Sequence, residues 1–159
     1  MEIQAATEDV FYYDTNGVST ITITGYEGSA SELVIPDTID GYTVTKIGAE
    51  VFQKNTNLST VTLPSGLVSI GSYAFYECTN LKSIVIPDAV TSIGTEAFYG
   101  CSSLASVELS SNLITLGYNA FVNCVALSSI TIPKKMSRCG NATGGPVSGC
   151  THLYTATIE

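Results

Sequence analysis

The sequence predicts a β-rich solenoid of the α/β repeat class, in which short coils of chain stack on one another. Three observations predict it: apolar residues recur every 23 residues, each unit contains an alternating strand pattern, and four of the five Phe share one repeat position. A unit this short cannot bury its apolar residues alone, whereas stacked units place each one over its own copy about 4.8 Å away. Apolar residues make up 45% of the 159 residues, which suffices for one such array.

Four complete repeats cover residues 47–138, and the block 70–92 shows the pattern best, as IGSYAFYECTNLKSIVIPDAVTS. Its L-x-x-I-x-I segment predicts a strand, and the following Pro ends the pairing because it has no N–H to donate. The V-x-x-I-G segment predicts a second, shorter extended stretch, and T-E-A-F-Y-G-C of the next block predicts one helical or 3₁₀ turn. We expect the I-x-I segments to form a parallel sheet. We expect the Phe column to form a continuous spine, made of Phe52, Phe75, Phe98 and Phe121.

Residues 10–46 predict an N-terminal β-hairpin cap followed by an incomplete first coil. Val10–Tyr13 and Val18–Thr24 are strand-like and flank a turn that contains Asn-Gly, a strong hairpin signal. Leu33–Pro36 then reproduces the strand and Pro positions of the repeat. We expect the hairpin to cover the first open edge of the sheet, because an open edge pairs with other chains.

The two ends of the chain depart from the repeat. Residues 1–9 are expected to form a disordered or extended tail, and residues 139–159 an irregular fifth repeat with the Gly-rich insertion CGNATGGP. The chain stops at Glu159, inside what should be a strand, so the last coil is expected to be uncapped. Two alternatives follow: the chain is a fragment of a longer protein, or two copies form an end-to-end homodimer through this coil.

Composition excludes several classes of partner. Six Lys and Arg against fourteen Asp and Glu give a net charge of −8, so the chain lacks the basic surface that nucleic acids and anionic membranes require. Its apolar runs are far shorter than the roughly 20 residues of a membrane span, so no direct membrane insertion is expected. The first residues, MEIQAATEDV, do not form a signal peptide. They leave open a cytoplasmic protein or a secreted one whose signal has been removed.

The cysteines follow the repeat. Cys78, Cys101 and Cys124 are 23 residues apart and Cys150 follows 26 residues later, which predicts buried free thiols in equivalent positions rather than disulfides. Cys139 falls outside this spacing and is the expected exposed thiol.

No catalytic, cofactor or metal site is predicted. His152 is the only imidazole, and the cysteines form no C-x₂-C pair. The acidic residues fall singly at outward positions, and neither G-x-S-x-G nor H-E-x-x-H occurs. The sequence therefore predicts that the chain is not an enzyme.

The repeat motif I-G-x-x-A-F-x-x-C-x-x-L-x-x-I-x-I-P-x-x-V-x-x resembles the BspA-like, Treponema-pallidum-type form of the leucine-rich repeat. The resemblance covers residues 33–158. The chain departs from the motif at Asn55 in the Cys position, at Ser110 in the Pro position and in the late fifth block. The resemblance implies a right-handed leucine-rich-repeat solenoid with its parallel strands on the concave side.

In that geometry two groups of side chains are candidate binding surfaces. The concave wall is small, hydroxyl-rich and nearly neutral, and its candidate residues are Ser59, Thr60, Thr62, Lys82, Ser83, Val85, Ser106, Glu108, Ser129 and Thr131. The alternative is a solvated face without a ligand. An aromatic contact set lies near the turn edge: Tyr73, Tyr76, Tyr99 and Tyr118. The alternative is that these rings shield the rim of the Phe spine.

The resembled family consists of surface and secreted proteins. It includes adhesins that bind extracellular-matrix and clotting proteins and mediate cell–cell attachment. The resemblance therefore implies a non-catalytic interaction module, extracellular or at the bacterial cell surface, whose partner is a protein such as a host matrix protein, or a glycan. Two alternatives stay open: a structural spacer in a longer surface protein, and a glycan-binding or hydrolytic module. The absence of Trp and of paired acids weighs against the latter.

Overall fold

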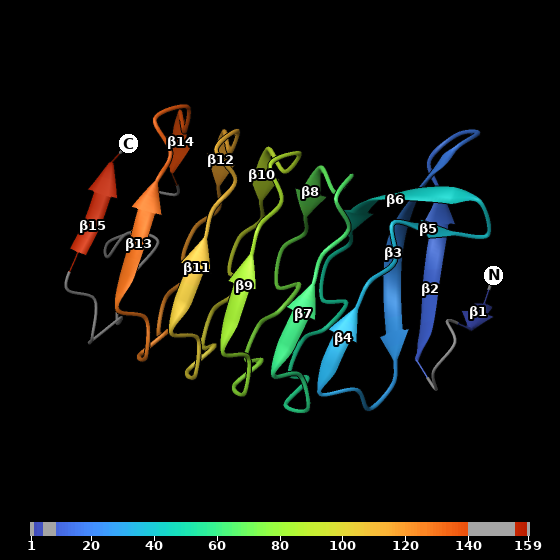
Figure 1. Ribbon diagram of the computed structural model, residues 1–159, viewed down its shortest axis with the longest axis horizontal. Coiled ribbons are helices and arrows are strands. Elements are labelled where there is room, and N and C mark those ends of the chain that lie inside the picture. The colour runs from blue at the N-terminus through green and yellow to red at the C-terminus, as the bar shows by residue number, and fades with distance from the viewer. Residues whose placement is uncertain (1, 5–8, 140–154, 159) are drawn as a thin grey trace.

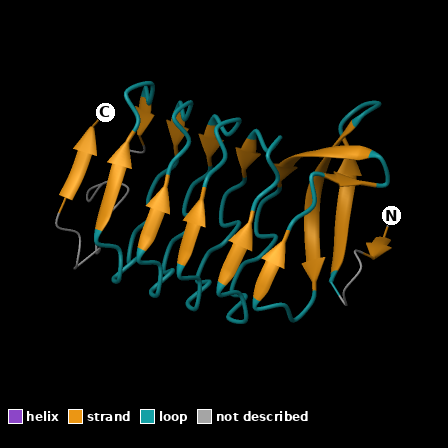
Figure 2. Ribbon diagram, viewed as in Figure 1, coloured by secondary structure: helices purple, strands orange, loops and turns teal. Residues whose placement is uncertain are grey.

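Coils of chain stack along one axis in the computed structural model, with longer strands on one wall and shorter strands on a second wall behind it (Figure 1). The structure describes residues 2–4, 9–139 and 155–158. Its regular elements are all strands, joined by turns and loops (Figure 2). No helix occurs in this part of the chain, so none there is long and apolar enough to cross a membrane.

The longer strands form the long-strand wall, one strand per coil, at the I-x-I segments of the repeat. Strand pairs are parallel and in register with the repeat, so that Ile84 lies opposite Val107. The β4 strand of the incomplete first coil pairs with β7 in the same way. The strands are β4 (Glu32–Val34), β7 (Thr60–Thr62), β9 (Ser83–Val85), β11 (Ser106–Glu108), β13 (Ser129–Ile132) and β15 (Thr155–Ile158).

The shorter strands form one uninterrupted parallel ladder, the short-strand wall. Ile70 pairs with Ile93, and Ile93 with Leu116, each one repeat further along the chain. The predicted second extended stretch of each repeat is therefore confirmed. The two-residue strands are β8 (Ser69–Ile70), β10 (Ser92–Ile93), β12 (Thr115–Leu116) and β14 (Arg138–Cys139). The longer β6 (Tyr42–Ile47) joins this ladder through Lys46 and Ile47, which pair with β8.

An antiparallel hairpin of β2 (Val10–Thr15) and β3 (Thr20–Glu27) continues the short-strand wall at its N-terminal end. β3 pairs in parallel with β6, and β1 (Glu2–Gln4) pairs with β2 on the outer side. β5 (Thr38–Ile39) folds back on β6 through the tight turn Asp40-Gly41. The hairpin thus extends the short-strand wall, while β4 is the end strand of the long-strand sheet.

The predicted Phe spine runs through the core between the two walls. Ring centroids are 4.9 Å apart for Phe52 and Phe75, 5.1 Å for Phe75 and Phe98, and 5.1 Å for Phe98 and Phe121. The rings stack nearly parallel, and all four are buried. The ring of Tyr26, in the hairpin, packs against Phe52 with the two ring centroids 5.2 Å apart, and so extends the spine toward the N-terminus. The prediction that each repeat position lies over its own copy is confirmed.

Three cysteines are buried free thiols, as predicted. Each thiol donates to a Phe carbonyl one coil earlier: Cys78 Sγ to Phe52 O at 3.0 Å, and Cys101 Sγ to Phe75 O at 3.2 Å. The third, Cys124, does the same. Burial raises the pKa of Cys78 to about 12 and that of Cys101 well above its ordinary value. Cys150 and the side chain of Cys139 lie outside the described residues.

The predicted helical or 3₁₀ turns are replaced by successive non-helical turns in the described residues, at 49–54, 72–77, 95–100 and 118–123. The second and sixth residues of each turn segment have positive φ, such as Tyr73 at 59° and Glu77 at 53°, which interrupts a helix. The backbone then bonds between coils instead of within one. Phe75 N, for example, donates to Ala97 O at 2.7 Å.

The coils approach one another most closely at the glycine in the second position of each repeat, which is Gly48, Gly71, Gly94 or Gly117. A Cβ at Gly94 would lie 2.4 Å from Ser72 N, and one at Gly117 would lie 2.3 Å from Gly94 C. No side chain fits there, which explains why this repeat position is Gly throughout.

Candidate interaction surface

The candidate wall residues lie on the outer side of the long-strand wall. All are exposed except Ser59, which is half-buried and donates its hydroxyl to Ser31 O at 2.9 Å. Outward side chains form two rows across the strands because alternate strand residues face opposite ways. The first row is Glu32, Thr60, Ser83, Ser106 and Ser129, and the second is Val34, Thr62, Val85, Glu108 and Thr131.

The junctions between neighbouring long strands are of two kinds. The β4–β7 and β9–β11 junctions each contain three paired residues. The β7–β9 junction contains one pair, Thr60 with Ser83, and β11 and β13 belong to different sheets. The long-strand wall is therefore closed and open at alternate junctions, in contrast to the continuous short-strand wall.

The difference lies at the carboxyl ends of the strands. At the closed junctions Ile35 N donates to Thr62 O at 3.0 Å, and Ile86 N to Glu108 O at 2.8 Å. Leu63 and Leu109 hold the equivalent position at the open junctions. Neither donates its N–H to the neighbouring coil.

An aspartate–serine clasp accompanies the β4–β7 junction and the β9–β11 junction. Asp37 Oδ1 accepts the N–H of Ser65 at 2.7 Å and its hydroxyl at 3.0 Å. Asp88 Oδ1 accepts the N–H of Ser111 at 3.1 Å and its hydroxyl at 2.9 Å. The Ser111 backbone N–H, followed by its hydroxyl, lowers the pKa of Asp88 below its ordinary value.

The open junctions have no clasp because the earlier coil carries Ser rather than Asp at this position. Here the earlier coil supplies Ser65 or Ser111, whose hydroxyl already bonds to the Asp of the coil before it. The sequence signal is an alternation of Ile-Pro-Asp with Leu-Pro-Ser or Leu-Ser-Ser at the strand ends. The grooves were not among the features predicted from the sequence.

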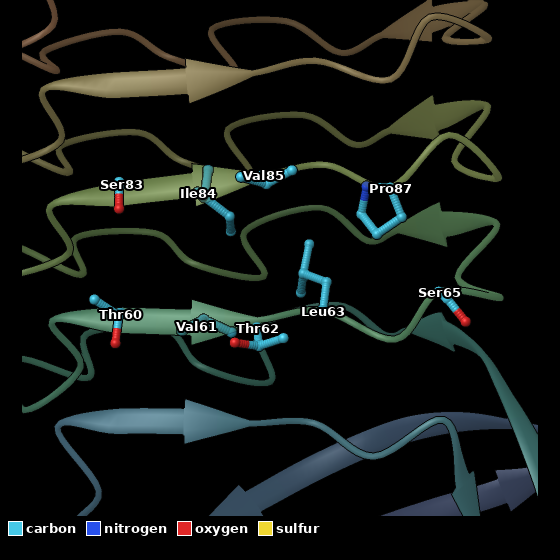
Figure 3. A pocket seen from close by; sticks show the side chains of 9 residues that line it. All are labelled: Thr60, Val61, Thr62, Leu63, Ser65, Ser83, Ile84, Val85 and Pro87. Carbon is cyan, nitrogen blue, oxygen red and sulfur yellow. The ribbon is translucent and has the colours of Figure 1, made fainter.

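The β7–β9 junction opens into the first groove, of about 460 Å³. Leu63 and Ile84 project into the space between the two strands, and Ser65 and Pro87 stand at its far end (Figure 3). The lining residues are Thr60, Val61, Thr62, Leu63, Ser65, Ser83, Ile84, Val85 and Pro87, none of them charged or aromatic.

The β11–β13 junction opens into the second groove, of about 230 Å³. Leu109 and Ile132 are half-buried there, whereas the equivalent Ile35 and Ile86 are buried. Its lining residues are Leu109, Ser111, Thr131, Pro133, Lys134 and Lys135, so this groove has a basic rim.

The tyrosine set lies in the turn segments that precede the long strands. The rings of Tyr76 and Tyr99 stack with their centroids 5.1 Å apart, and the ring of Tyr73 meets that of Tyr76 edge-on with their centroids 5.8 Å apart. Asn123 Nδ2 donates to the Tyr99 hydroxyl at 2.9 Å. Burial, followed by the Glu77 charge, raises the pKa of Tyr76. Tyr118 is 50% exposed. The stacked rings suit a contact set and a shield for the Phe spine equally.

The two walls present hydroxyls, backbone amides and aliphatic groups rather than reactive ones. Within residues 2–4, 9–139 and 155–158, no three His, Cys, Asp or Glu side chains are grouped to hold a metal ion. His152 lies outside these residues. The side chains of the long-strand wall offer hydrogen bonding, apolar contact and, at Glu32, Lys82 and Glu108, charge.

Comparisons with known proteins agree with this architecture. A leucine-rich repeat protein of T. pallidum is 31% identical, with a TM-score of 0.84 over 92% of this chain and 67% of its own. A leucine-rich cell surface protein of Faecalibacterium prausnitzii is also 31% identical, with a TM-score of 0.84 over 100% of this chain and 43% of its own. A leucine-rich repeat protein of Bacteroides ovatus is 29% identical, with a TM-score of 0.82 over 94% of this chain and 41% of its own.

This chain thus spans less than half the length of the last two proteins. No curated protein matches it. The BspA-type leucine-rich repeat region matches residues 25–143 in 6 copies, so the strands, Phe spine and thiols described above are the parts of a known repeat. The chain belongs to the BspA-type leucine-rich repeat family.

Proposed function

We propose that this chain is a non-catalytic, adhesin-like interaction module of a bacterial cell-surface or secreted protein, and that it binds a partner protein on the long-strand wall. The observation that supports this most is the wall itself: two rows of small exposed side chains held on a stacked core, interrupted by grooves at alternate junctions. A fixed array of shallow hydroxyl and aliphatic groups suits a broad protein contact better than an enclosed small-molecule site.

The class of partner follows from charge and chemistry. The net charge of −8 disfavours nucleic acids and anionic lipid surfaces. The leucine-rich cell surface protein of F. prausnitzii supports a location at the cell surface or outside the cell. A host extracellular-matrix protein is the partner we propose to test first, with a glycan as the alternative.

A structural spacer is the second candidate function. The observation that favours it is the coverage of 43% and 41% of two longer relatives, since a repeat array can separate other parts of a long chain.

A binding panel of immobilised matrix proteins and glycans separates these functions. We expect the wild-type chain to bind a protein on the panel, and the wall variant Thr60→Arg/Ser106→Arg to lose that binding. The control Gln53→Arg/Asn57→Arg adds the same charge at exposed positions outside both strand walls and is expected to bind normally. Equal binding by both variants would contradict binding on the long-strand wall. If the wild-type chain bound nothing on the panel, the structural-spacer function would be favoured.

A further inference from the structure

We propose that the first groove, between β7 and β9, holds an aliphatic side chain from an extended, uncharged segment of the partner protein. This inference rests on the proposed function and names the part of the wall that makes the specific contact. It commits to a peptide rather than a sugar or a lipid, for reasons of shape, polarity and charge.

The floor of the groove is apolar and its rim is exposed. Val61 and Leu63 are each 7% exposed, whereas Ile84, on the opposite strand, is 2% exposed. Val85 stands at the rim and is 57% exposed. An aliphatic side chain that enters between β7 and β9 therefore removes apolar surface of both strands from water. The volume of about 460 Å³ lies within the range of ligand sites.

The groove also presents hydroxyl groups that can bond to a peptide backbone. At the closed junctions the residues equivalent to Leu63 and Val85 bond to each other, as Ile86 N does to Glu108 O at 2.8 Å. At the open junction the Leu63 N–H and the Val85 C=O make no such bond. The outward hydroxyls of Thr60, Thr62 and Ser83 line the groove and can bond to the C=O and N–H groups of an extended segment that lies across it.

The lack of charge in the groove also limits which side chains it can hold. None of the nine lining residues is charged, so a charged side chain would lose its hydration without gaining a partner. The second groove differs in this respect, because Lys134 and Lys135 line it. We therefore expect the first groove to select Leu, Ile or Val and to reject Asp and Lys.

The test uses the full 159-residue chain, ¹⁵N-labelled, and capped pentapeptides Ac-Ser-Ser-X-Ser-Ser-NH₂ with X as Leu, Val, Asp or Lys. We expect the Leu and Val peptides to shift the Leu63 and Val85 amide resonances, with the Ile93 amide of the short-strand wall as an internal reference, and the Asp and Lys peptides to leave them unmoved. Equal shifts with all four peptides, or shifts confined to the tyrosine set, would overturn the proposal.

Two matched variants locate the contact. Val85→Arg covers the mouth of the groove, whereas Val34→Arg adds the same charge in the same row at a closed junction. We expect Val85→Arg to weaken binding of the Leu peptide at least about tenfold, as for the loss of one buried aliphatic side chain, and Val34→Arg to leave it unchanged. Equal weakening by both variants would contradict a contact in the groove.

This test separates the inference from the proposed function. If a panel protein binds the wall and the Leu peptide moves no groove amide, the groove proposal fails while the proposed function stands. If the Leu peptide binds the groove and no panel protein binds the chain, the groove proposal stands while the choice of matrix partner fails.

Discussion

The same coils build two walls, and the walls differ in how evenly they are joined. On the short-strand wall the β6–β8, β8–β10 and β10–β12 junctions repeat one bond: Gly71 N to Ile47 O at 2.8 Å, Gly94 N to Ile70 O at 2.9 Å, and Gly117 N to Ile93 O at 2.8 Å. On the long-strand wall closed and open junctions alternate. The coils are thus held in place by the core and the short-strand wall, which leaves the long-strand wall free to open where a clasp is missing.

The core between the walls is expected to carry the largest share of stability. Phe98→Ala removes a buried ring stacked on both sides and should lower the free energy of unfolding by about 3–5 kcal/mol. Tyr99→Ala removes a ring from the half-buried outer stack and should cost about 1 kcal/mol. Urea denaturation of both variants measures the difference. Equal losses would mean that the outer tyrosines are part of the core.

The short-strand wall is expected to be intolerant of added volume. Gly94→Ala places a Cβ within 2.4 Å of the Ser72 backbone and should cost about 1–3 kcal/mol or prevent folding. Gly66→Ala is the matched control, since the nearest atom to its Cβ lies at 3.5 Å, and should change stability by less than about 0.5 kcal/mol. Thermal and urea unfolding compare the two. If Gly94→Ala leaves the free energy of unfolding unchanged, the coils can separate on this wall as well.

The repeat period predicts the stacking because identical residues at equal spacing must meet their copies. The equal spacing places Phe75 over Phe52 and Cys101 over Cys78 without any knowledge of the turns. The turn segments could not be predicted in this way, because Tyr73 and Glu77 adopt left-handed conformations that these residue types seldom signal. The grooves could not be predicted either, because the alternation of Ile-Pro-Asp with Leu-Pro-Ser has a period of two repeats and is lost when every block is compared with one consensus.

Amide hydrogen exchange tests the two kinds of junction directly. The Leu63 and Leu109 amides at the open junctions should exchange at least about fivefold faster than the Ile35 and Ile86 amides, which corresponds to one net hydrogen bond of about 1 kcal/mol. All four residues hold the same repeat position, so each pair is a control for the other. Equal protection would mean that the open junctions close in solution.

If the aspartate–serine clasp decides which junctions are closed, moving it to the β7–β9 junction should close that junction and open its neighbours. The double variant Ser65→Asp/Asp88→Ser places a carboxylate on the earlier coil of the β7–β9 junction. It also replaces the Ser65 hydroxyl that donates to Asp37 at the β4–β7 junction and removes the Asp88 carboxylate from the β9–β11 junction. We expect the Leu63 amide to become protected and the Ile35 and Ile86 amides to lose protection. Unchanged exchange at all three would show that the choice of Leu or Ile, rather than the clasp, sets which junctions open.

The smallest expected effect is the titration of the clasp at the β9–β11 junction. Two bonds from Ser111 hold the pKa of Asp88 below 3.8, so its contribution to stability is present above pH 3.8 and is lost as the pH falls through the folded value. Ser111→Ala removes the hydroxyl but keeps the N–H, and should raise the Asp88 pKa part of the way toward 3.8, as measured by NMR titration of the carboxyl carbon. Ser106→Ala, on the same coil at an outward strand position, should leave that pKa unchanged. An Asp88 pKa of 3.8 in the wild-type chain would mean that the clasp does not hold the carboxylate in solution, and the closed junction would then need another cause.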